Sequence, residues 1–265
     1  FVVEPSLKRD TVYYWLRDTT LVNMDTLRIE ASYYMSDSLG ALFLQTDTIE
    51  ALAKVSYEKR KKEEQKEYDK WKKEQDKKKK REEKYDSIMP VKPLQMKISP
   101  TGQVEPLQTV RFESPQPLNP VDTSAVHLYV QIDSVWYKTP HEFTQISPRI
   151  CTLKAEWQEG LEYSLEVDSA AFETIYGLAA SRIKQGLKVS EADKFSTLTV
   201  ELSGLPPLDS AAVVRVMMVD KSDKIVRQTV MEADGAATFF YVKPATYYLR
   251  AYVDQNGNGE WDTGC

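Results

Sequence analysis

One short stretch near the end of the chain spaces oxygen-bearing side chains as a cation-binding loop does. An Asp and two Asn residues alternate with other residues and precede a glycine at the sixth position, as at the start of an EF-hand loop. Alternate spacing lets a curling loop point several oxygens at one ion, and calcium prefers such hard ligands. The candidate calcium ligands are Asp254, Asn256, Asn258, Glu260 and Asp262.

The same stretch also suits a plain turn. The twelfth position, where an EF-hand loop places a bidentate Glu, is Cys265, and no flanking helices are expected. An Asn-Gly pair is a strong hairpin signal. Both a structural calcium ion that stiffens the loop and an Asx-rich turn without metal remain open, and no other cofactor is expected.

Residues suited to nucleophilic or metal-assisted catalysis are scarce. The two histidines, His127 and His141, lie in no nucleophile-elbow or Cys-His signature. The two cysteines, Cys151 and Cys265, are far apart and match no metal or redox spacing, and we expect Cys151 to be a small buried residue. Carboxylates are plentiful, but no spacing isolates the pair that a glycosidase needs. The sequence therefore argues against an enzyme.

A run of Lys and Glu without glycine or proline interrupts the chain. Residues 58–84 contain 14 Lys or Arg and nine Asp or Glu, a composition that favours helix. We predict one long charged helix or linker at 54–88. Aromatic residues at helical spacing form one stripe that could bind a partner: Tyr57, Tyr68, Trp71 and Tyr85. The alternative is a solvated spacer, and the mixed charge disfavours nucleic acid and anionic membrane as partners.

The rest of the chain has β patterns, with β-branched and aromatic residues in short alternating runs. Residues 1–53 hold three strands, too few for a sandwich, so we expect the C-terminal part of a domain that begins outside this sequence. Residues 89–194 hold seven short strands and predict a β-sandwich. Residues 195–265 predict a further meander, which would form a smaller sandwich, either complete or incomplete. One helical turn is expected at 170–175, closed by Gly177.

Two motifs resemble a known family. Residues 157–172, which begin Trp-x-x-Gly-x-x-Tyr and end with Asp-Ser-Ala-Ala-Phe, are followed by the Tyr-Gly pair at 176–177. They resemble the bacterial Ig-like domain of Bacteroidota envelope lipoproteins. Residues 248–264 are similar to the last recognisable motif of those proteins, and residues 1–50 fit the end of their preceding Ig-like domain. We expect Trp157 and Tyr163 to be core or edge aromatic residues of facing strands in this domain.

The resemblance implies a mainly β chain of tandem Ig-like and transthyretin-like β-sandwich domains, with the charged helix inserted between domains. It also implies a non-catalytic lipoprotein of the outer membrane, on the periplasmic or cell-surface side. Its membrane contact would be a lipid anchor upstream of this sequence. Other envelope proteins, among them an outer-membrane β-barrel complex, are the expected partners. The alternative is a surface glycan- or ligand-binding module that uses exposed aromatic rings, with these candidates: Trp136, Tyr137 and Trp261.

Overall fold

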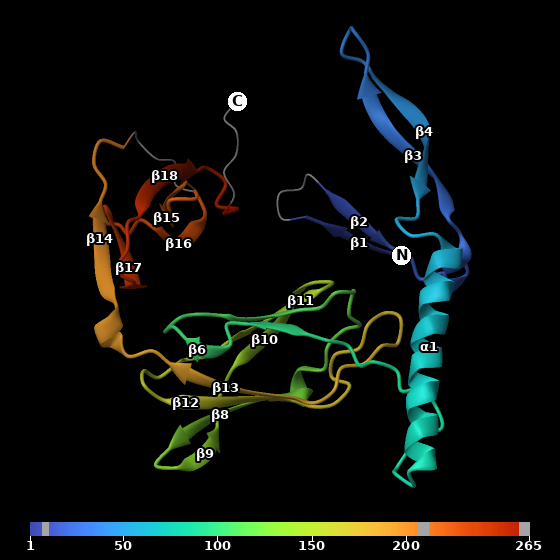
Figure 1. Cartoon of the computed structure of the whole chain (residues 1–265). Helices are drawn as coiled ribbons and strands as arrows, with labels where there is room; N and C mark the ends of the chain where they lie inside the picture. The colour runs from blue at the N-terminus through green and yellow to red at the C-terminus, as the bar shows by residue number, and fades with distance from the viewer. Residues whose placement is uncertain (7–10, 206–211, 260–265) are drawn as a thin grey trace. The chain divides into compact units, whose positions relative to one another are not determined.

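The computed structural model describes residues 1–6, 11–205 and 212–259, and it is mainly β, with 46% of residues in strands and 14% in helices. The chain forms two compact units (Figure 1). The first comprises residues 1–95, 115–119 and 172–180, and the second comprises residues 96–114, 120–171 and 181–265. Each unit is described by itself below.

The first unit contains two antiparallel hairpins. β1 (Val2–Pro5) pairs with β2 (Val12–Trp15), and β3 (Thr26–Ser36) pairs with β4 (Leu42–Leu52) over eleven residues without a bulge. In the turn between β3 and β4, the Asp37 carboxylate accepts the backbone N–H groups of Leu39 and Ala41, both at 2.8 Å. Asp suits turns for this reason. The turn fixes the register and therefore which residues share a face.

The first turn of helix α1 (Tyr57–Lys80) forms hydrogen bonds to the segment that directly precedes β3. Asp25, directly before β3, accepts the Tyr57 backbone N–H at 2.6 Å and so takes the place of a helix cap. The Arg60 guanidinium donates to the Val22 carbonyl at 2.7 Å. A carboxylate at the positive end of the helix is also electrostatically favourable.

The helix ends at Lys80, so it occupies only the middle of the segment predicted as a helix or linker, 54–88. Glu82 adopts a positive φ of 58°, and the Glu83 N–H donates to the Lys78 carbonyl at 3.0 Å. A residue in the left-handed region with this bond closes a helix in the Schellman manner. The composition did not predict where the helix ends, because position 82 carries Glu rather than the glycine that usually ends a helix.

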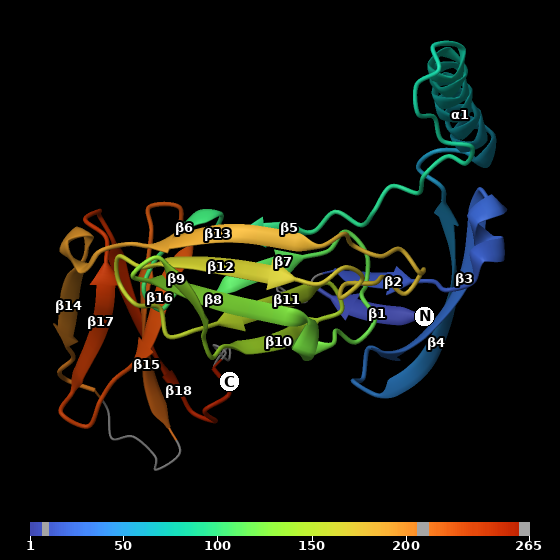
Figure 2. The same ribbon diagram turned by 90° about the horizontal axis from the view of Figure 1, so that it is seen from below.

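The second unit begins with two sheets. The four-stranded sheet has the order β10 (Glu142–Ser147), β11 (Ile150–Lys154), β7 (Val110–Glu113), β5 (Lys97–Ser99). The five-stranded sheet has the order β6 (Gly102–Val104), β13 (Ile183–Val189), β12 (Glu162–Val167), β8 (Val126–Ile132), β9 (Val135–Lys138). Strands β13, β12 and β8 run side by side in Figure 2.

Alternating residues of these strands form a buried core, as a sandwich requires. The largest fully buried side chains of this part are Phe112, Leu128, Leu153, Tyr163 and Leu165. Trp157 packs edge-on against Tyr163, with ring centroids 4.9 Å apart, and its indole N–H donates to the Gln108 carbonyl at 2.7 Å. Of the two predicted positions, core or edge, Trp157 and Tyr163 therefore occupy the core.

Two further sheets complete the second unit. β14 (Ser196–Glu201) pairs with β17 (Ala236–Val242), and β15 (Val213–Val219) lies between β16 (Ile225–Val230) and β18 (Tyr248–Asp254). Their common core consists of Val216, Met218, Ala237, Phe239 and Val242. The second unit is thus built of several sheets with buried inner faces, in a β-sandwich-like arrangement.

One local prediction was wrong, and two strands were not predicted. Residues 170–175 form no helical turn; Thr174 instead bridges to Leu118, and its hydroxyl accepts the N–H groups of Tyr176 and Leu178. A Thr side chain that bonds nearby backbone competes with helix formation. Gly177 does have the positive φ expected of it, 80°. Strands β6 and β10 were not predicted.

Candidate functional site

The β3–β4 hairpin has one mainly apolar face. On the opposite face, named the polar face, charged and polar residues lie together with exposed Tyr34, Leu42, Leu44 and Leu52. On the polar face Arg28 pairs with Glu50 at 3.0 Å. Since directly opposed residues share a face, the register places the following residues together on the other side: Leu27, Ile29, Ala31, Tyr33, Met35, Phe43, Ile49 and Ala51. We name this set the apolar hairpin face. Ile29 and Ile49, which oppose one another, are 44% and 52% exposed.

The apolar hairpin face carries a single carboxylate. Asp47 lies opposite Ala31 and accepts the Tyr33 hydroxyl at 2.5 Å and the Gln45 amide at 2.9 Å. The Tyr33 hydrogen bond, followed by that from Gln45, holds the pKa of Asp47 below its usual value of 3.8, so the group stays ionised near neutral pH. An isolated two-stranded hairpin is marginal in water, and an exposed apolar patch of this kind marks an interaction site. The alternation in residues 26–33 was the sequence signal for this face.

The four aromatic residues predicted as a partner-binding stripe do not stay together. Tyr57, Tyr68 and Trp71 lie on α1, and the rings of the last two are 5.7 Å apart. Tyr85 lies beyond the helix end, with the Lys79 ammonium 5.6 Å from its ring centroid. Tyr68 and Tyr85 are exposed, whereas Tyr57 and Trp71 are half-buried.

The chain after α1 returns along the stripe and bonds to it. Gln75, which is buried, accepts the Asp86 backbone N–H at 3.0 Å, and the Lys92 ammonium pairs with Glu67 at 3.3 Å. Gln75 lies one turn beyond Trp71, on the same face of the helix. The chain's own segment therefore bonds along the face that the sequence assigned to a partner.

The predicted calcium loop is organised around Asp254. Its buried carboxylate accepts the Arg215 guanidinium Nε–H at 2.6 Å and the Gly259 backbone N–H at 2.8 Å, both through Oδ2. Oδ1 is buried and accepts no hydrogen bond from the described residues. Asn258 donates its backbone N–H to the Asn256 side chain at 3.0 Å, which is an Asx turn.

The described part of the loop forms a turn. The negative charge of its Asp254 carboxylate is already neutralised by the Arg215 guanidinium. Glu260 and Asp262, the other two predicted ligands, lie outside the described residues. Within residues 1–6, 11–205 and 212–259, no three His, Cys, Asp or Glu side chains are grouped to hold a metal ion. Calcium binding at this loop stays a prediction.

Millimolar calcium is expected to raise the melting temperature of the chain modestly, because the ion would stiffen the loop while Arg215 opposes it. Differential scanning calorimetry with calcium, and with magnesium at the same concentration as the control, measures this. Asp254→Asn should abolish the rise in melting temperature that calcium produces. If calcium leaves the melting temperature unchanged, the prediction that this loop binds calcium is wrong.

The ion pair at Asp254 is expected to make stability depend on pH. The Arg215 hydrogen bond lowers the pKa of Asp254 from its usual 3.8. A depressed folded-state pKa contributes stability that is fully present above the unfolded pKa and is lost as the pH falls through the lower folded value. Urea midpoints from about pH 5 to about pH 2 should therefore converge for the natural chain and Asp254→Asn. Parallel pH profiles would contradict this role.

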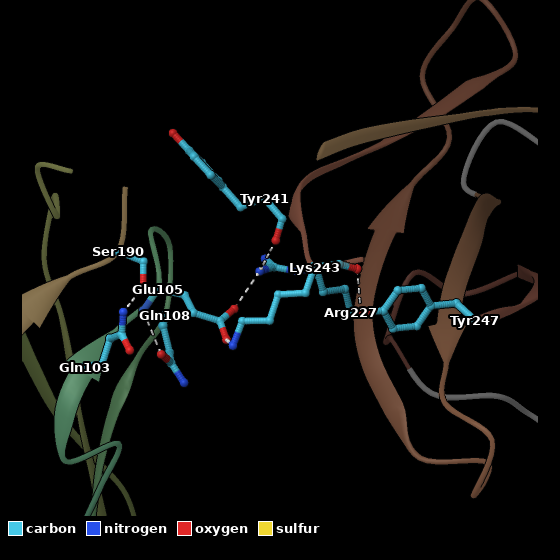
Figure 3. A network of polar contacts seen from close by, with 8 residues as sticks. All are labelled: Gln103, Glu105, Gln108, Ser190, Arg227, Tyr241, Lys243 and Tyr247. Atoms are coloured by element: carbon cyan, nitrogen blue, oxygen red, sulfur yellow. Dashed lines mark hydrogen bonds and ion pairs between the residues drawn. The ribbon is translucent and has the colours of Figure 1, made fainter. Parts of the chain in front are cut away.

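A second polar cluster joins the two parts of the second unit (Figure 3). Glu105, which follows β6, accepts Lys243 at 2.6 Å and Arg227 at 3.3 Å. Arg227 also donates to the Tyr241 carbonyl at 3.0 Å, and the Glu105 backbone N–H donates to the Gln108 side chain at 2.9 Å. Two cations neutralise Glu105, so the cluster suits a structural junction better than proton transfer.

Neither histidine is placed for nucleophilic catalysis. His127 lies 3.2 Å from Asp168, and His141 lies 3.3 Å from the Thr139 carbonyl. Neither bonds to a serine or cysteine in the part of the chain that the structure describes. Cys151 is fully buried, as predicted, and burial raises its pKa to about 12. A thiol held in the protonated form is a poor nucleophile.

The helices that the structure describes include none with the length and apolar character needed to span a membrane. Helix α1 is long enough, but its residues are mostly charged.

Comparison with known proteins gives only distant similarities. No family model matches the sequence, and no curated protein matches it. Among solved structures, the N-terminal part of the bacterial S-layer protein SbsC is 10% identical, with 63% of this chain and 43% of that chain covered and a TM-score of 0.31. The Group B Streptococcus pullulanase SAP is 13% identical over 62% of this chain and 22% of that chain, with a TM-score of 0.23.

A pullulanase from Anoxybacillus sp. LM18-11, complexed with maltotetraose, is 12% identical over 59% of this chain and 22% of that chain, with a TM-score of 0.18. The chain thus spans less than half the length of each of these three structures. TM-scores of this size establish neither a common fold nor a common function.

Proposed function

We propose that this chain is a non-catalytic interaction protein of the bacterial cell envelope that docks other envelope proteins through the apolar hairpin face. The single observation that carries the docking role is that five large side chains of this face are exposed among the described residues: Ile29, Tyr33, Met35, Phe43 and Ile49. Strand residues that alternate so regularly are typical of a sheet with one buried face. A partner that covers the face would remove apolar side chains from water, at roughly 25 cal/mol per Å².

The surface also indicates the chemistry of the partner. Asp47 is an ionised carboxylate within the apolar hairpin face, with the polar side chain of Gln45 beside it. A complementary partner is therefore an apolar sheet or helix surface with one Lys or Arg opposite Asp47. Exposed Tyr68 on α1 supplies a second aromatic contact for a partner.

The finer architecture and location belong to the same proposal. The resemblance in residues 157–177 and 248–264 supports tandem Ig-like and transthyretin-like domains, with α1 between them. It also supports a lipid-anchored outer-membrane protein whose partners include a β-barrel complex. No cofactor beyond the calcium already considered is proposed.

Affinity purification of the tagged protein from cell envelopes in mild detergent tests the docking role, with two matched variants. Ile49→Lys places a charge on the apolar hairpin face, whereas Thr48→Lys places the same charge on the polar face of the same strand. A partner recovered in stoichiometric amount with the unchanged chain should be recovered equally with Thr48→Lys. We expect Ile49→Lys to reduce its recovery by about tenfold, since one buried charge costs more than 1.4 kcal/mol.

Two outcomes would contradict the proposal. Equal recovery with both variants would show that the partner binds elsewhere. Recovery of the chain alone, with Ile49→Lys and Thr48→Lys equally well folded by circular dichroism, would remove the docking role.

A further inference from the structure

A row of side chains crosses the outer face of the five-stranded sheet. Trp136 of β9 lies opposite Gln131 of β8, Gln131 lies opposite Glu162 of β12, and Glu162 lies opposite Lys188 of β13. Their sequence neighbour Tyr163 is fully buried. Because successive residues of a strand point to opposite faces, the row from Trp136 to Lys188 faces solvent.

A hollow of about 300 Å³ lies on this outer face, with Trp136, Glu162 and Lys188 among the residues that line it. Gly186, in the middle of β13, is also part of its lining. A Cβ atom added at Gly186 would meet nothing within 4 Å, so the space above this strand is open. Trp136 is 46% exposed, which leaves much of its indole accessible to a ligand.

Three polar groups at the hollow have no partner among the described residues. Within the described residues, the Trp136 indole N–H, the Glu162 carboxylate and the Lys188 ammonium form no hydrogen bond or ion pair. Lys184, at the same hollow, instead pairs with Glu166 at 3.0 Å. The hollow therefore offers an acceptor and two donors beside an aromatic ring.

We propose that this hollow binds a neutral saccharide, with Trp136 as the stacking platform. A hexose ring has a face of C–H groups and a rim of hydroxyls. The electron-rich face of an indole attracts polarised C–H groups. The hydroxyls both donate and accept hydrogen bonds, so they suit Glu162 and Lys188 together.

The charges at the hollow favour this ligand over others. A polyanion would be repelled by Glu162, and a polycation would be repelled by Lys188 and Lys184. A volume of about 300 Å³ is at the lower end for a ligand pocket, which suits one or two sugar units and weak, millimolar binding. The site uses different residues from the docking face and does not depend on it.

Titration of the whole ¹⁵N-labelled chain with maltohexaose, cellohexaose and mannohexaose tests the site. The readout is the tryptophan indole N–H signals together with the backbone N–H signals, so that binding to a chain without Trp136 can also be followed. We expect at least one of these probes to shift the Trp136 signal, which is assigned by its loss in Trp136→Ala. Trp136→Ala should weaken binding at least about tenfold, the size of one stacked aromatic contact. Tyr137→Ala, which removes the neighbouring exposed aromatic side chain from the other face of β9, should bind as the unchanged chain does.

Gly186→Leu is the second variant, because it fills the hollow without touching Trp136. Gly186 is not among the residues with a positive φ, so a side chain there is compatible with folding. Loss of binding in a well-dispersed Gly186→Leu spectrum would support the site, and retention of binding in Ile49→Lys would separate it from the docking face. The proposal is overturned if none of the three probes shifts a signal at tens of millimolar. It is equally overturned if Trp136→Ala and Gly186→Leu bind unchanged, or if only an anionic oligogalacturonate binds.

Discussion

Replacing Trp157 by alanine is expected to lower the free energy of unfolding of the second unit by about 3–5 kcal/mol. Trp157 is 8% exposed, packs edge-on against Tyr163 and donates its indole N–H to the Gln108 carbonyl. The alanine variant would leave a cavity against Tyr163 and an unsatisfied carbonyl at Gln108. Urea denaturation followed by circular dichroism measures the loss.

Two matched variants separate the causes of this loss. Trp157→Phe keeps an aromatic ring but removes the hydrogen bond to Gln108, and it should cost about 1–3 kcal/mol. Trp136→Ala removes an exposed tryptophan from the same unit and should change stability by less than about 0.5 kcal/mol. A Trp157→Ala chain as stable as Trp136→Ala would show that Trp157 is not part of the core.

Cys151 is expected to react with iodoacetamide about a thousandfold more slowly in the folded chain than in the unfolded chain at about pH 8. Burial raises the pKa of Cys151 from 9.0 to about 12, which lowers the thiolate fraction by roughly three powers of ten. Full burial of the residue in β11, opposite Phe112, also blocks access of the reagent. Mass spectrometry of the alkylated peptide follows this residue separately from Cys265.

The control is the same reaction in a high concentration of urea, where the pKa and the access of Cys151 return to ordinary values. Similar rates for Cys151 in the folded and unfolded chains would mean that β11 opens readily. That result would also revive the thiol as a candidate nucleophile.

Much of the fold followed from local pattern. Alternating runs at 26–33, 126–131 and 163–167 are strands, because a half-buried sheet requires this alternation. The Lys- and Glu-rich run contains a helix, because its residues have high helix propensity. Its end at Lys80 was missed, since Glu82 takes a backbone conformation that glycine usually adopts.

The candidate sites followed from the sequence only in part. The residues from Asp254 to Asn258 were singled out by their spacing, but Arg215, which neutralises Asp254, lies 39 residues away. Tyr57, Tyr68 and Trp71 do share α1, whereas Tyr85 does not. Trp136 was a candidate sugar-binding ring, but the open space at Gly186 could not be foreseen, because the register of β12 with β13 creates it.

The sequence by itself determined that this protein is mainly β, that it contains a charged helix and that Trp157, Tyr163 and Cys151 are buried. These are consequences of periodicity, propensity and side-chain polarity, which act over a few neighbouring residues. Only the tertiary structure decided which side chains meet. The pairing of Glu105 with Arg227, 122 residues apart, and the row from Trp136 to Lys188 depend on strand order and register, which long-range packing sets.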